Sequence, residues 1–456
     1  FSLDMSGFKL SRRSFLKTMG AAACIAPFFT RNLISAPPSG RVRFAAFGSA
    51  NMARTDINSI INHPNVDFIA TADVDSGYLA SIKKDMADKA PNLRIYADYR
   101  ELLDKEKDLD CISISTPDHC HGVQALSAMQ QGFHVYCQKP LTHDIYESRI
   151  LAQYATENKL VTQMGIQIHS EGVYRSTVKL IQSGIIGKIK EAYSWCGNRH
   201  WGSNDPRPTG SDPIPSSLNW YLWLNTAQDR PFVKDIYHPS NWRKVQDFGT
   251  GIFGDMGCHI FDPVFKSLGL TSPLSVRSEG PPPNDYFWGL KTEMLYIFPG
   301  TPYTAGDTIK VHWYDGPGER PPKEIMELVP GMPTLGSIFI GEKGLLVIPH
   351  IGAPVVYLKE GDKYVEFEDD DELKRLSLPS QNHWHQFVDG VLGNTKTSTS
   401  FDYSGPLTEA VLLGSVACKF PQTTLRWDAA AMKFDLKEAT KLVERKYRKG
   451  WDVKGL

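Results

Sequence analysis

The sequence predicts an α/β protein: a doubly wound parallel sheet, followed by an α+β domain with a large, mostly antiparallel open sheet. Two patterns predict this fold. Between residues 41 and 165, short apolar runs alternate with helical stretches, and parallel strands need such crossover connections. Beyond residue 165, most strand-like runs are separated by turn residues instead of helices, which is typical of antiparallel sheets. A chain of 456 residues is long enough for two or three domains.

The first half of the chain predicts one nucleotide-binding Rossmann domain, residues 41–165. Its expected strands are 42–47, 66–72, 93–96, 111–115, 133–137 and 161–164. Its expected helices are 51–62, 76–90, 99–103, 119–131 and 145–157. In a sheet of this kind, ligands bind at the carboxyl ends of the strands.

The remainder, residues 166–456, is expected to form the substrate and oligomerisation domain. After a helix at 172–182, its expected strands are 189–195, 293–298, 308–314, 337–340, 345–348 and 355–358. The Trp- and Pro-rich stretch 196–250 is expected to fold over the sheet as loops near the site and to contribute no core. Further helices are expected at 383–392, 406–418 and 436–447, with the C-terminal helices packing back on the Rossmann domain.

Composition excludes several classes of function. With 50 Lys plus Arg against 51 Asp plus Glu, the chain has no charge excess that would favour nucleic acid or an acidic membrane. A hydrophobic content of 41% excludes disorder and fibrous repeats. The 7 cysteines are scattered without a CxxC pair, so neither a disulfide framework nor a zinc ribbon is indicated. We expect no metal, because the pairs His119/His121 and His383/His385 lack a well-placed Cys or carboxylate partner.

The first 36 residues are expected to be a removable export signal. The segment Ser-Arg-Arg-Ser-Phe-Leu-Lys at 11–17 looks like a twin-arginine signal and matches every fixed position of that pattern. The apolar run that follows, 19–29, is too short to span a bilayer. We expect cleavage after Ala36 and a soluble periplasmic product. A basic amphipathic leader and a lipid anchor through Cys24 are the alternatives.

A cofactor site is predicted where the first strand meets its helix, at Gly48, Ser49, Ala50, Asn51 and Met52. A dinucleotide fingerprint uses glycines there so that the backbone and the helix N-terminus approach a pyrophosphate. Of the fingerprint's glycines only Gly48 is present, so an ordinary strand-to-helix turn is the alternative interpretation.

Asp73 ends the second expected strand, where a carboxylate accepts hydrogen bonds from ribose hydroxyls. It would repel a 2′-phosphate, and no Arg follows it, so NAD is favoured over NADP. A surface Asp in a loop is the alternative.

Two constellations indicate chemistry. Lys139 lies between Gln138 and Pro140 at the end of the fifth strand, where its ammonium could stabilise alkoxide character on a hydroxyl. Asp255 and His259 are spaced to lie one turn apart on a helix, so the carboxylate could orient an imidazole that exchanges protons. A His in a helix cap is the structural alternative.

Candidate substrate residues come from the 196–250 stretch. Trp242 and Arg243 could supply a ring platform and a hydroxyl donor for a sugar, and His200 with Trp201 is a weaker version of the same pair. Bracing of the loop is the alternative role. The aromatic run 220–224 is expected to be packing.

These residues resemble the glucose-fructose oxidoreductase, inositol dehydrogenase and rhizopine catabolism (Gfo/Idh/MocA) family, from about residue 41 to the end. Its marks are a Glu-Lys-Pro motif and a later Asp-x-x-x-His; the segments 116–119 and 447–451 match in context. The resemblance implies that Lys139 and His259 are the catalytic pair with Asp255 assisting. It also implies a cofactor lined by Gly48, Ser49, Ala50, Asn51, Met52, Asp73, Thr116, Pro117, His119, Gln138, Lys139 and Gln167.

The resemblance further implies a sugar, polyol or derived substrate and a homo-oligomer, dimer or tetramer. Gln138 departs from the family's usual Glu and removes its charge. We expect an NAD-dependent oxidoreductase acting on a carbohydrate CH-OH, with NAD held tightly because folded export would carry it along. An NAD-retaining glycoside hydrolase or lyase working through a transient keto-sugar is the alternative, and a non-catalytic binder is a third possibility.

Overall fold

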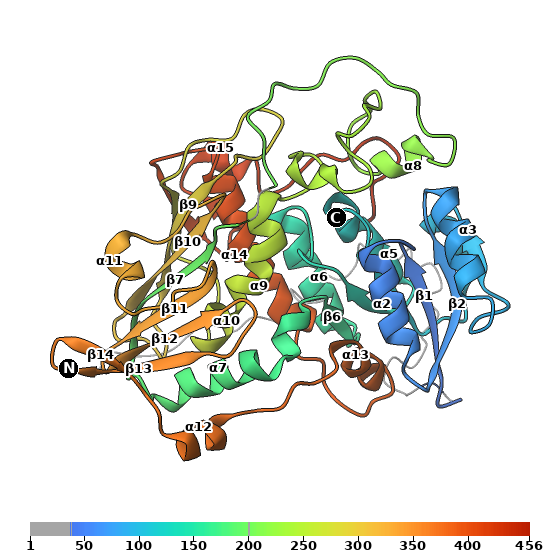
Figure 1. Ribbon diagram of the computed structural model, residues 1–456. Helices are drawn as coiled ribbons and strands as arrows, with labels where there is room; N and C mark the ends of the chain where they lie inside the picture. The colour runs from blue at the N-terminus through green and yellow to red at the C-terminus, as the bar shows by residue number, and fades with distance from the viewer. Residues whose placement is uncertain (1–36, 38, 199–200) are drawn as a thin grey trace, which may run out of the picture. The chain divides into compact units, whose positions relative to one another are not determined.

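The structure, a computed structural model, describes residue 37 and residues 39–198 and 201–456. The predicted export signal and the candidate His200 lie outside these residues. The described chain builds two sheets, one parallel and one mostly antiparallel (Figure 1). The predicted fold class, an α/β protein with a parallel sheet and a second, mostly antiparallel sheet, is therefore confirmed.

The first sheet has six parallel strands in the order β3-β2-β1-β4-β5-β6, which is the doubly wound order. Its strands are β1 (Val42–Phe47), β2 (Val66–Ala72), β3 (Arg94–Tyr96), β4 (Cys111–Ile114), β5 (His134–Cys137) and β6 (Thr162–Met164). Its helices are α2 (Met52–Ile61), α3 (Ser76–Asp85), α4 (Tyr99–Lys105), α5 (Asp118–Gln130) and α6 (Ile145–Glu157). The order reverses between β1 and β4, so a crevice opens at the carboxyl ends of these two strands.

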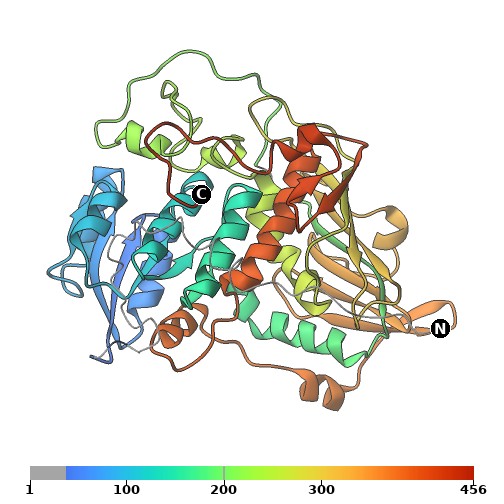
Figure 2. The ribbon, with the colours of Figure 1, turned by 180° about the vertical axis from the view of Figure 1, so that it is seen from behind.

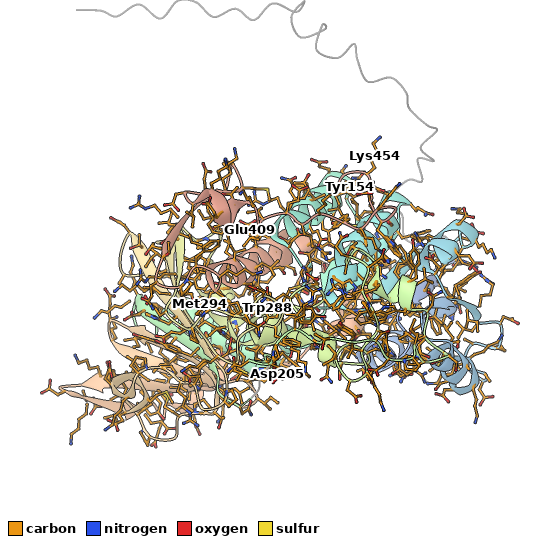
Figure 3. All side chains as sticks on the ribbon, turned by 90° about the horizontal axis from the view of Figure 1, so that it is seen from above. Tyr154, Asp205, Trp288, Met294, Glu409 and Lys454 are labelled. Atoms are coloured by element: carbon orange, nitrogen blue, oxygen red, sulfur yellow. The ribbon has the colours of Figure 1, made fainter. Side chains whose placement is uncertain are left out.

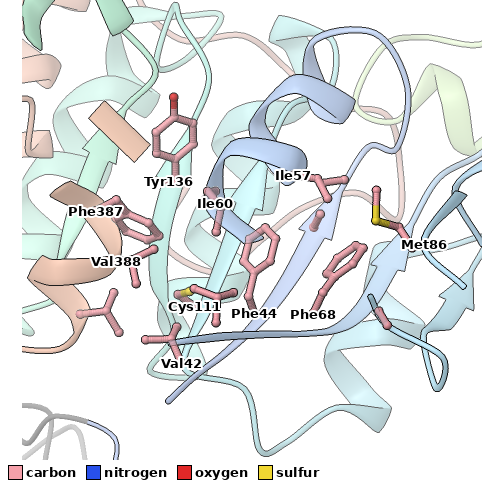
Figure 4. Packing of buried hydrophobic residues seen from close by; sticks show 14 of the residues in the cluster. Val42, Phe44, Ile57, Ile60, Phe68, Met86, Cys111, Tyr136, Phe387 and Val388 are labelled. Atoms are coloured by element: carbon pink, nitrogen blue, oxygen red, sulfur yellow. The ribbon is translucent and has the colours of Figure 1, made fainter. Parts of the chain in front are cut away.

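A cluster of buried hydrophobic residues packs α2 against this sheet (Figure 4). Phe44 of β1 and Phe68 of β2 stack with ring centroids 5.5 Å apart. Phe387 and Val388 of α13 (His383–Val391) complete the cluster, so a late segment of the chain packs against α2. Burying each large apolar side chain stabilises the fold by roughly 1.5–3 kcal/mol.

The second sheet has ten strands in the order β14-β13-β12-β11-β7-β10-β9-β8-β15-β16. All neighbours are antiparallel except β7 and β10, which are parallel. The strands are β7 (Ile189–Cys196), β8 (Ser275–Ser278), β9 (Thr292–Pro299), β10 (Thr308–Asp315), β11 (Leu335–Gly341), β12 (Gly344–Pro349), β13 (Val355–Glu360), β14 (Lys363–Glu366), β15 (Thr424–Asp428) and β16 (Lys433–Phe434).

Helices connect the two sheets. Besides α13, the α-helices of the second half are α7 (Gly172–Ser183), α8 (Trp220–Leu224), α9 (Cys258–Ile260), α10 (Asp262–Ser267), α11 (Lys323–Met326), α12 (Asp370–Leu376), α14 (Phe401–Ala417) and α15 (Lys437–Thr440). The long α14 contacts α6 of the first domain on one side and β8 of the second sheet on the other (Figure 2). Glu409 of α14 accepts a hydrogen bond from Arg149 of α6 at 2.6 Å and binds the two domains together. None of the helices in the described part is long and apolar enough to cross a bilayer.

Two expectations about the second half are wrong. The stretch 196–250 does form a core, in which Trp220, Trp223 and Phe248 are buried together, because its many aromatic side chains supply enough apolar area. Its backbone is also tied to the first domain: Ser76 N donates to Ser217 O at 2.8 Å. The expected helix at 436–447 is only Lys437–Thr440, and the chain then runs without regular structure.

Candidate active site

A cavity of about 540 Å³ opens at the carboxyl edge of the parallel sheet. Both domains and the 196–250 stretch contribute to its walls. Of the predicted site residues, its lining includes Gly48, Ser49, Ala50, Asn51, Met52, Asp73, Thr116, Pro117, Gln138, Lys139, Trp201, Trp242, Arg243, Asp255 and His259.

The turn between β1 and α2 is shaped by Gly48. Its φ is +92°, and a Cβ at this position would lie 2.6 Å from Ser115 O, so no other residue fits without strain. Ser49 donates to Asp73 Oδ2 through both its backbone N–H and its hydroxyl, each at 2.8 Å. The turn is therefore clamped with the N-terminus of α2 at the cavity, an arrangement that favours an anionic group.

Asp73 lies in the wall of the cavity at the end of β2. Burial raises the pKa of its carboxyl, against hydrogen bonds from Asp75 and Ser49. The next two residues are Val74 and Asp75, and Asp75 lies 3.2 Å from Nε2 of His238. The carboxylates at this end of β2 can accept hydrogen bonds from ribose hydroxyls, and their negative charge would repel a 2′-phosphate.

Lys139 and Asp255 meet across the two domains. Lys139 Nζ donates to Asp255 Oδ1 at 2.6 Å and to its backbone oxygen at 3.2 Å. Trp201 Nε1 donates to Asp255 Oδ2 at 2.9 Å, and Arg243 Nε lies 3.7 Å from Oδ1. Burial alone would raise the pKa of Asp255, but the charges of Lys139 and Arg243 outweigh it and hold the pKa well below its usual range. Asp255 is therefore an anion that fixes the Lys139 ammonium.

His259 follows a wide helical turn, Phe253–Gly257, of the π type. Small residues make the turn feasible, because a Cβ at Gly254 would lie 1.8 Å from Thr250 Oγ1. Burial, reinforced by the charge of Lys139, lowers the pKa of His259 well below 6.5, so its imidazole is neutral and can accept a proton. Its Nδ1 is buried without a hydrogen-bond partner in the described residues.

The expected support of His259 by Asp255 is not what the structure shows. The carboxylate of Asp255 accepts its hydrogen bonds from Lys139 and Trp201, and none joins it to His259 in the described residues. The physical reason is charge: a carboxylate binds an ammonium in preference to a neutral imidazole. The ring of His350 lies nearest to His259 among the aromatic contacts, at 5.8 Å between centroids.

Gln138 is held by a buried carboxylate. Its Nε2 lies 2.9 and 3.2 Å from the two oxygens of Asp56, which also accept hydrogen bonds from Ser115 Oγ and Trp384 Nε1. Burial raises the pKa of Asp56 to about 6. A glutamate at position 138 would face this carboxylate and be repelled, so the site favours an amide here.

The side chain of His121 links two loops at the edge of the cavity. Its Nδ1 lies 2.8 Å from Pro140 O and its Nε2 lies 2.8 Å from Thr116 O. The ring therefore ties the loop after β5, which carries Lys139, to the loop after β4. Both ring nitrogens of His121 are engaged by backbone oxygens, so neither is free to bind a metal.

Two predicted cofactor residues do not reach the cavity. His119 is buried with Nε2 3.2 Å from Trp223 O, and its ring packs against Trp223 and Phe248. Gln167 Nε2 donates to Tyr136 OH at 3.4 Å. The described residues contain no group of three or more His, Cys, Asp or Glu placed to hold a metal ion.

Other lining residues are not expected from the sequence. Among them are Tyr78, Asp98, Asn225, His238, His350 and Trp451. Of these, only Trp451 belongs to a segment that carries the family resemblance. Their positions depend on how distant segments pack, which leaves no local signal.

Comparison with known families decides the identity. The model of an oxidoreductase family with an NAD-binding Rossmann fold matches residues 42–166. The model of the same family's C-terminal alpha/beta domain matches residues 171–296. The chain belongs to the Gfo/Idh/MocA oxidoreductase family. Its cofactor domain fits NAD, because the clamped turn, Asp73 and the edge of β5 line one cavity.

Curated members of the Gfo/Idh/MocA family share part of the chain. Levoglucosan dehydrogenase of Pseudarthrobacter phenanthrenivorans is 26% identical over 168 residues, 36% of this chain and 34% of that protein. Inositol 2-dehydrogenase of Rhodococcus jostii is 28% identical over 218 residues, 46% of this chain and 58% of that protein. The matches thus span from about a third to less than two thirds of these relatives.

Solved Gfo/Idh/MocA-like structures share the fold over most of the chain. WlbA dehydrogenase from Bordetella pertussis, in complex with NADH and UDP-GlcNAcA, has a TM-score of 0.57 at 13% identity. The likeness covers 85% of this chain and 99% of that one. GenD2 from gentamicin A biosynthesis, in complex with NAD, has a TM-score of 0.56 at 14% identity, over 85% and 97% of the two chains. At these identities the likeness concerns the fold.

Proposed function

We propose that this chain is an NAD-dependent oxidoreductase that acts on a hydroxyl-bearing carbon of a carbohydrate. One observation carries the proposal: a single cavity runs from the Gly48 turn and Asp73 to Lys139 and His259. It therefore brings the side chains suited to a dinucleotide to those suited to an alcohol group.

Cofactor binding would rest on the first domain. The Gly48 to Met52 turn would hold the pyrophosphate, and Asp73 would accept the ribose hydroxyls. Thr116, Pro117 and Gln138 would line the middle of the cavity. When bound, NAD supplies a nicotinamide that accepts a hydride from the substrate carbon or returns one.

The chemistry of the chain's own residues is a proton transfer beside a fixed cation. The neutral His259 takes the proton of the substrate hydroxyl. The Lys139 ammonium, fixed by Asp255, stabilises the negative charge that develops on the oxygen. Asp255 acts through its hydrogen bond with Lys139, so its proposed role is positioning.

The substrate end of the cavity suits a sugar ring. The guanidinium carbon of Arg243 lies 5.5 Å from the ring centroid of Trp201 and 4.4 Å from that of Trp242. Such a cluster offers apolar faces to C–H groups and donors to hydroxyls. The sugar and polyol names of the relatives levoglucosan dehydrogenase and inositol 2-dehydrogenase support the same substrate class.

Export is part of the proposal. The motif at 11–17 supports export of the folded, NAD-loaded protein by the twin-arginine route to the periplasm, with a lipid anchor through Cys24 as the alternative to a soluble product. Association into a dimer or tetramer is proposed from the family resemblance.

The test begins with mass spectrometry of the denatured purified protein, which should release NAD. The protein is then mixed with a panel of sugars, polyols and glycosides while the reduction of the nicotinamide is followed. Reduction without cleavage supports the oxidoreductase. Release of an aglycone with no net NADH would support the glycoside hydrolase or lyase alternative instead.

A further inference from the structure

The last residues of the chain return to the first domain. After α15, residues 441–456, which we name the C-terminal strap, run to α5 without forming a helix or strand. Gln130 of α5 donates to the backbone oxygen of Lys454 at 2.6 Å, and Lys454 lies near the helices of that domain (Figure 3). The strap thus crosses the domain that carries the cofactor cavity.

The strap is anchored first at Arg445. Its guanidinium donates to Glu147 Oε1 at 2.9 Å, to Asp144 Oδ2 at 3.2 Å and to His119 O at 2.7 Å. Tyr447 OH also donates to Glu147 Oε1, at 2.6 Å. Both carboxylates are buried, so releasing this part of the strap would leave uncompensated buried charges.

The second anchor is Arg448, which is also buried. Its Nε donates to Asn225 O at 3.0 Å and its Nη2 to Tyr221 O at 2.7 Å. Asp229 accepts from Nη1 at 2.5 Å. Arg448 therefore fixes the strap to the segment around α8, which also lines the cavity.

Two residues that are close to Arg448 in the chain or in contact with it each carry a buried polar atom without a hydrogen-bond partner in the described residues. Trp451 and Asn225 both line the cavity, and they are only 3% and 2% exposed. The indole N–H of Trp451 and the amide oxygen of Asn225 make no hydrogen bond in the described structure. A buried donor and a buried acceptor that are left unsatisfied each destabilise the protein. Both side chains therefore lie at the cavity with hydrogen-bonding capacity that no described residue uses.

Their place identifies which half of the cofactor they meet. The ring of Trp451 lies 4.2 Å from the guanidinium carbon of Arg100, at the start of α4 and next to β3. β3 pairs with β2, which ends at Asp73, whereas Lys139 and His259 lie towards β5. With the pyrophosphate at the Gly48 turn, this side of the crevice receives the adenosine half of a dinucleotide.

We propose that Trp451 and Asn225 bind the adenine base of the cofactor, and that the C-terminal strap retains the cofactor by closing over it. The inference rests on the proposed function. Its consequence is slow exchange: the adenosine half leaves only when the strap lifts, which requires Arg445 or Arg448 to give up buried partners.

The experiment uses the full chain with its native cofactor. The NAD content of dialysed protein is measured after denaturation, and the dissociation rate is measured by exchange against isotopically labelled NAD. Stacking of a base on an aromatic ring is strong enough that Trp451→Ala should exchange about 10- to 100-fold faster. Trp451→Phe keeps the ring and loses the N–H, so it should lie between. Lys449→Ala, an exposed position in the same strap, should match the wild type.

A second variant separates cofactor contact from folding. Asn225 has φ +47°, a conformation that glycine adopts more easily, so Asn225→Gly removes the amide without backbone strain. It should also exchange faster at unchanged thermal stability. Wild-type exchange rates in both Trp451→Ala and Asn225→Gly would overturn the strap inference and leave the oxidoreductase proposal standing. A wild-type protein that neither contains NAD nor binds it in titration would overturn the proposed function itself.

Discussion

Lys139 and Asp255 form an ion pair that joins the two domains, with Nζ 2.6 Å from Oδ1. Lys139 follows β5 of the parallel sheet, and Asp255 lies in the wide helical turn that leads to His259. The pair therefore places a fixed ammonium next to a neutral imidazole in one cavity. This arrangement exists only when both domains are docked.

Replacing Lys139 by alanine should abolish turnover and leave NAD bound. The ammonium is the group that stabilises the developing oxyanion, so kcat should fall by about 10²- to 10³-fold. Asp255 keeps Trp201 and Arg243 as partners, so the fold should persist. Steady-state kinetics and NAD content on the same sample check both halves. Wild-type kcat in Lys139→Ala would refute the assignment.

The pH profile should report a neutral His259. Because burial lowers its pKa well below 6.5, the imidazole stays unprotonated as the pH falls from about 8 to 6.5. In the oxidation direction kcat/KM should be flat over that range, and its acid limb should appear only below pH 6.5. His259→Gln should lack the acid limb along with most of its activity. An acid limb at or above pH 6.5 in the wild type contradicts the prediction.

Gly48→Ala should destabilise the protein and empty its cofactor site. The new Cβ would meet Ser115 O at 2.6 Å on a backbone with φ +92°, at a cost of about 1–3 kcal/mol. Denaturant unfolding and NAD content measure the two effects. Ala50→Gly is the matched control: it adds the fingerprint's second glycine and should hold NAD at least as well as the wild type. Equal stability of Gly48→Ala and wild type would count against the turn geometry.

Asp56 should make stability depend on pH. Its pKa of about 6 lies above its ordinary value of 3.8, so the folded chain binds the proton more tightly than the unfolded chain. The contribution to unfolding free energy is present below about pH 4 and is lost as the pH rises through 6. The gap corresponds to about 3 kcal/mol. Asp56→Asn has no carboxyl to titrate and serves as the control. Between pH 4 and 7, urea unfolding should show the wild type losing about 3 kcal/mol of unfolding free energy relative to this variant. The same pH dependence of unfolding free energy in both proteins would contradict the prediction.

Asp73→Asn should weaken discrimination against NADP. The amide keeps an oxygen to accept from Ser49 but removes the charge that repels a 2′-phosphate. Titration of cofactor-free protein should show the ratio of NADP to NAD affinity rising by about tenfold, the effect of roughly 1.4 kcal/mol. Ser81→Ala, an exposed change on α3, serves as the control. No change in the ratio would mean that Asp73 does not face the ribose.

Much of the first domain could be predicted because most of its strands, with the exception of β3, are largely buried. Short apolar runs bounded by turn residues, such as 42–47 and 111–115, are typical of such strands. Since ligands bind at the carboxyl ends of these strands, Asp73 and Lys139 could be placed at the site from sequence order alone.

The rest depends on packing between distant segments. The apolar spacing at 436–447 suggested a helix, but Arg445 and Tyr447 instead bind the buried Glu147. His119 follows β4, as a cofactor residue would, yet Trp223 and Phe248 cover it. Asp56 lies on the buried face of α2, and that periodicity was the one signal that could have revealed it.

The most direct test of the account is the nicotinamide spectrum of the purified, NAD-loaded protein on mixing with a panel of sugars, polyols and glycosides. The account predicts that at least one carbohydrate reduces the bound nicotinamide in the wild type and that none does so in Lys139→Ala. Bound NAD that no carbohydrate reduces in the wild type, or the same reduction in both proteins, would contradict it.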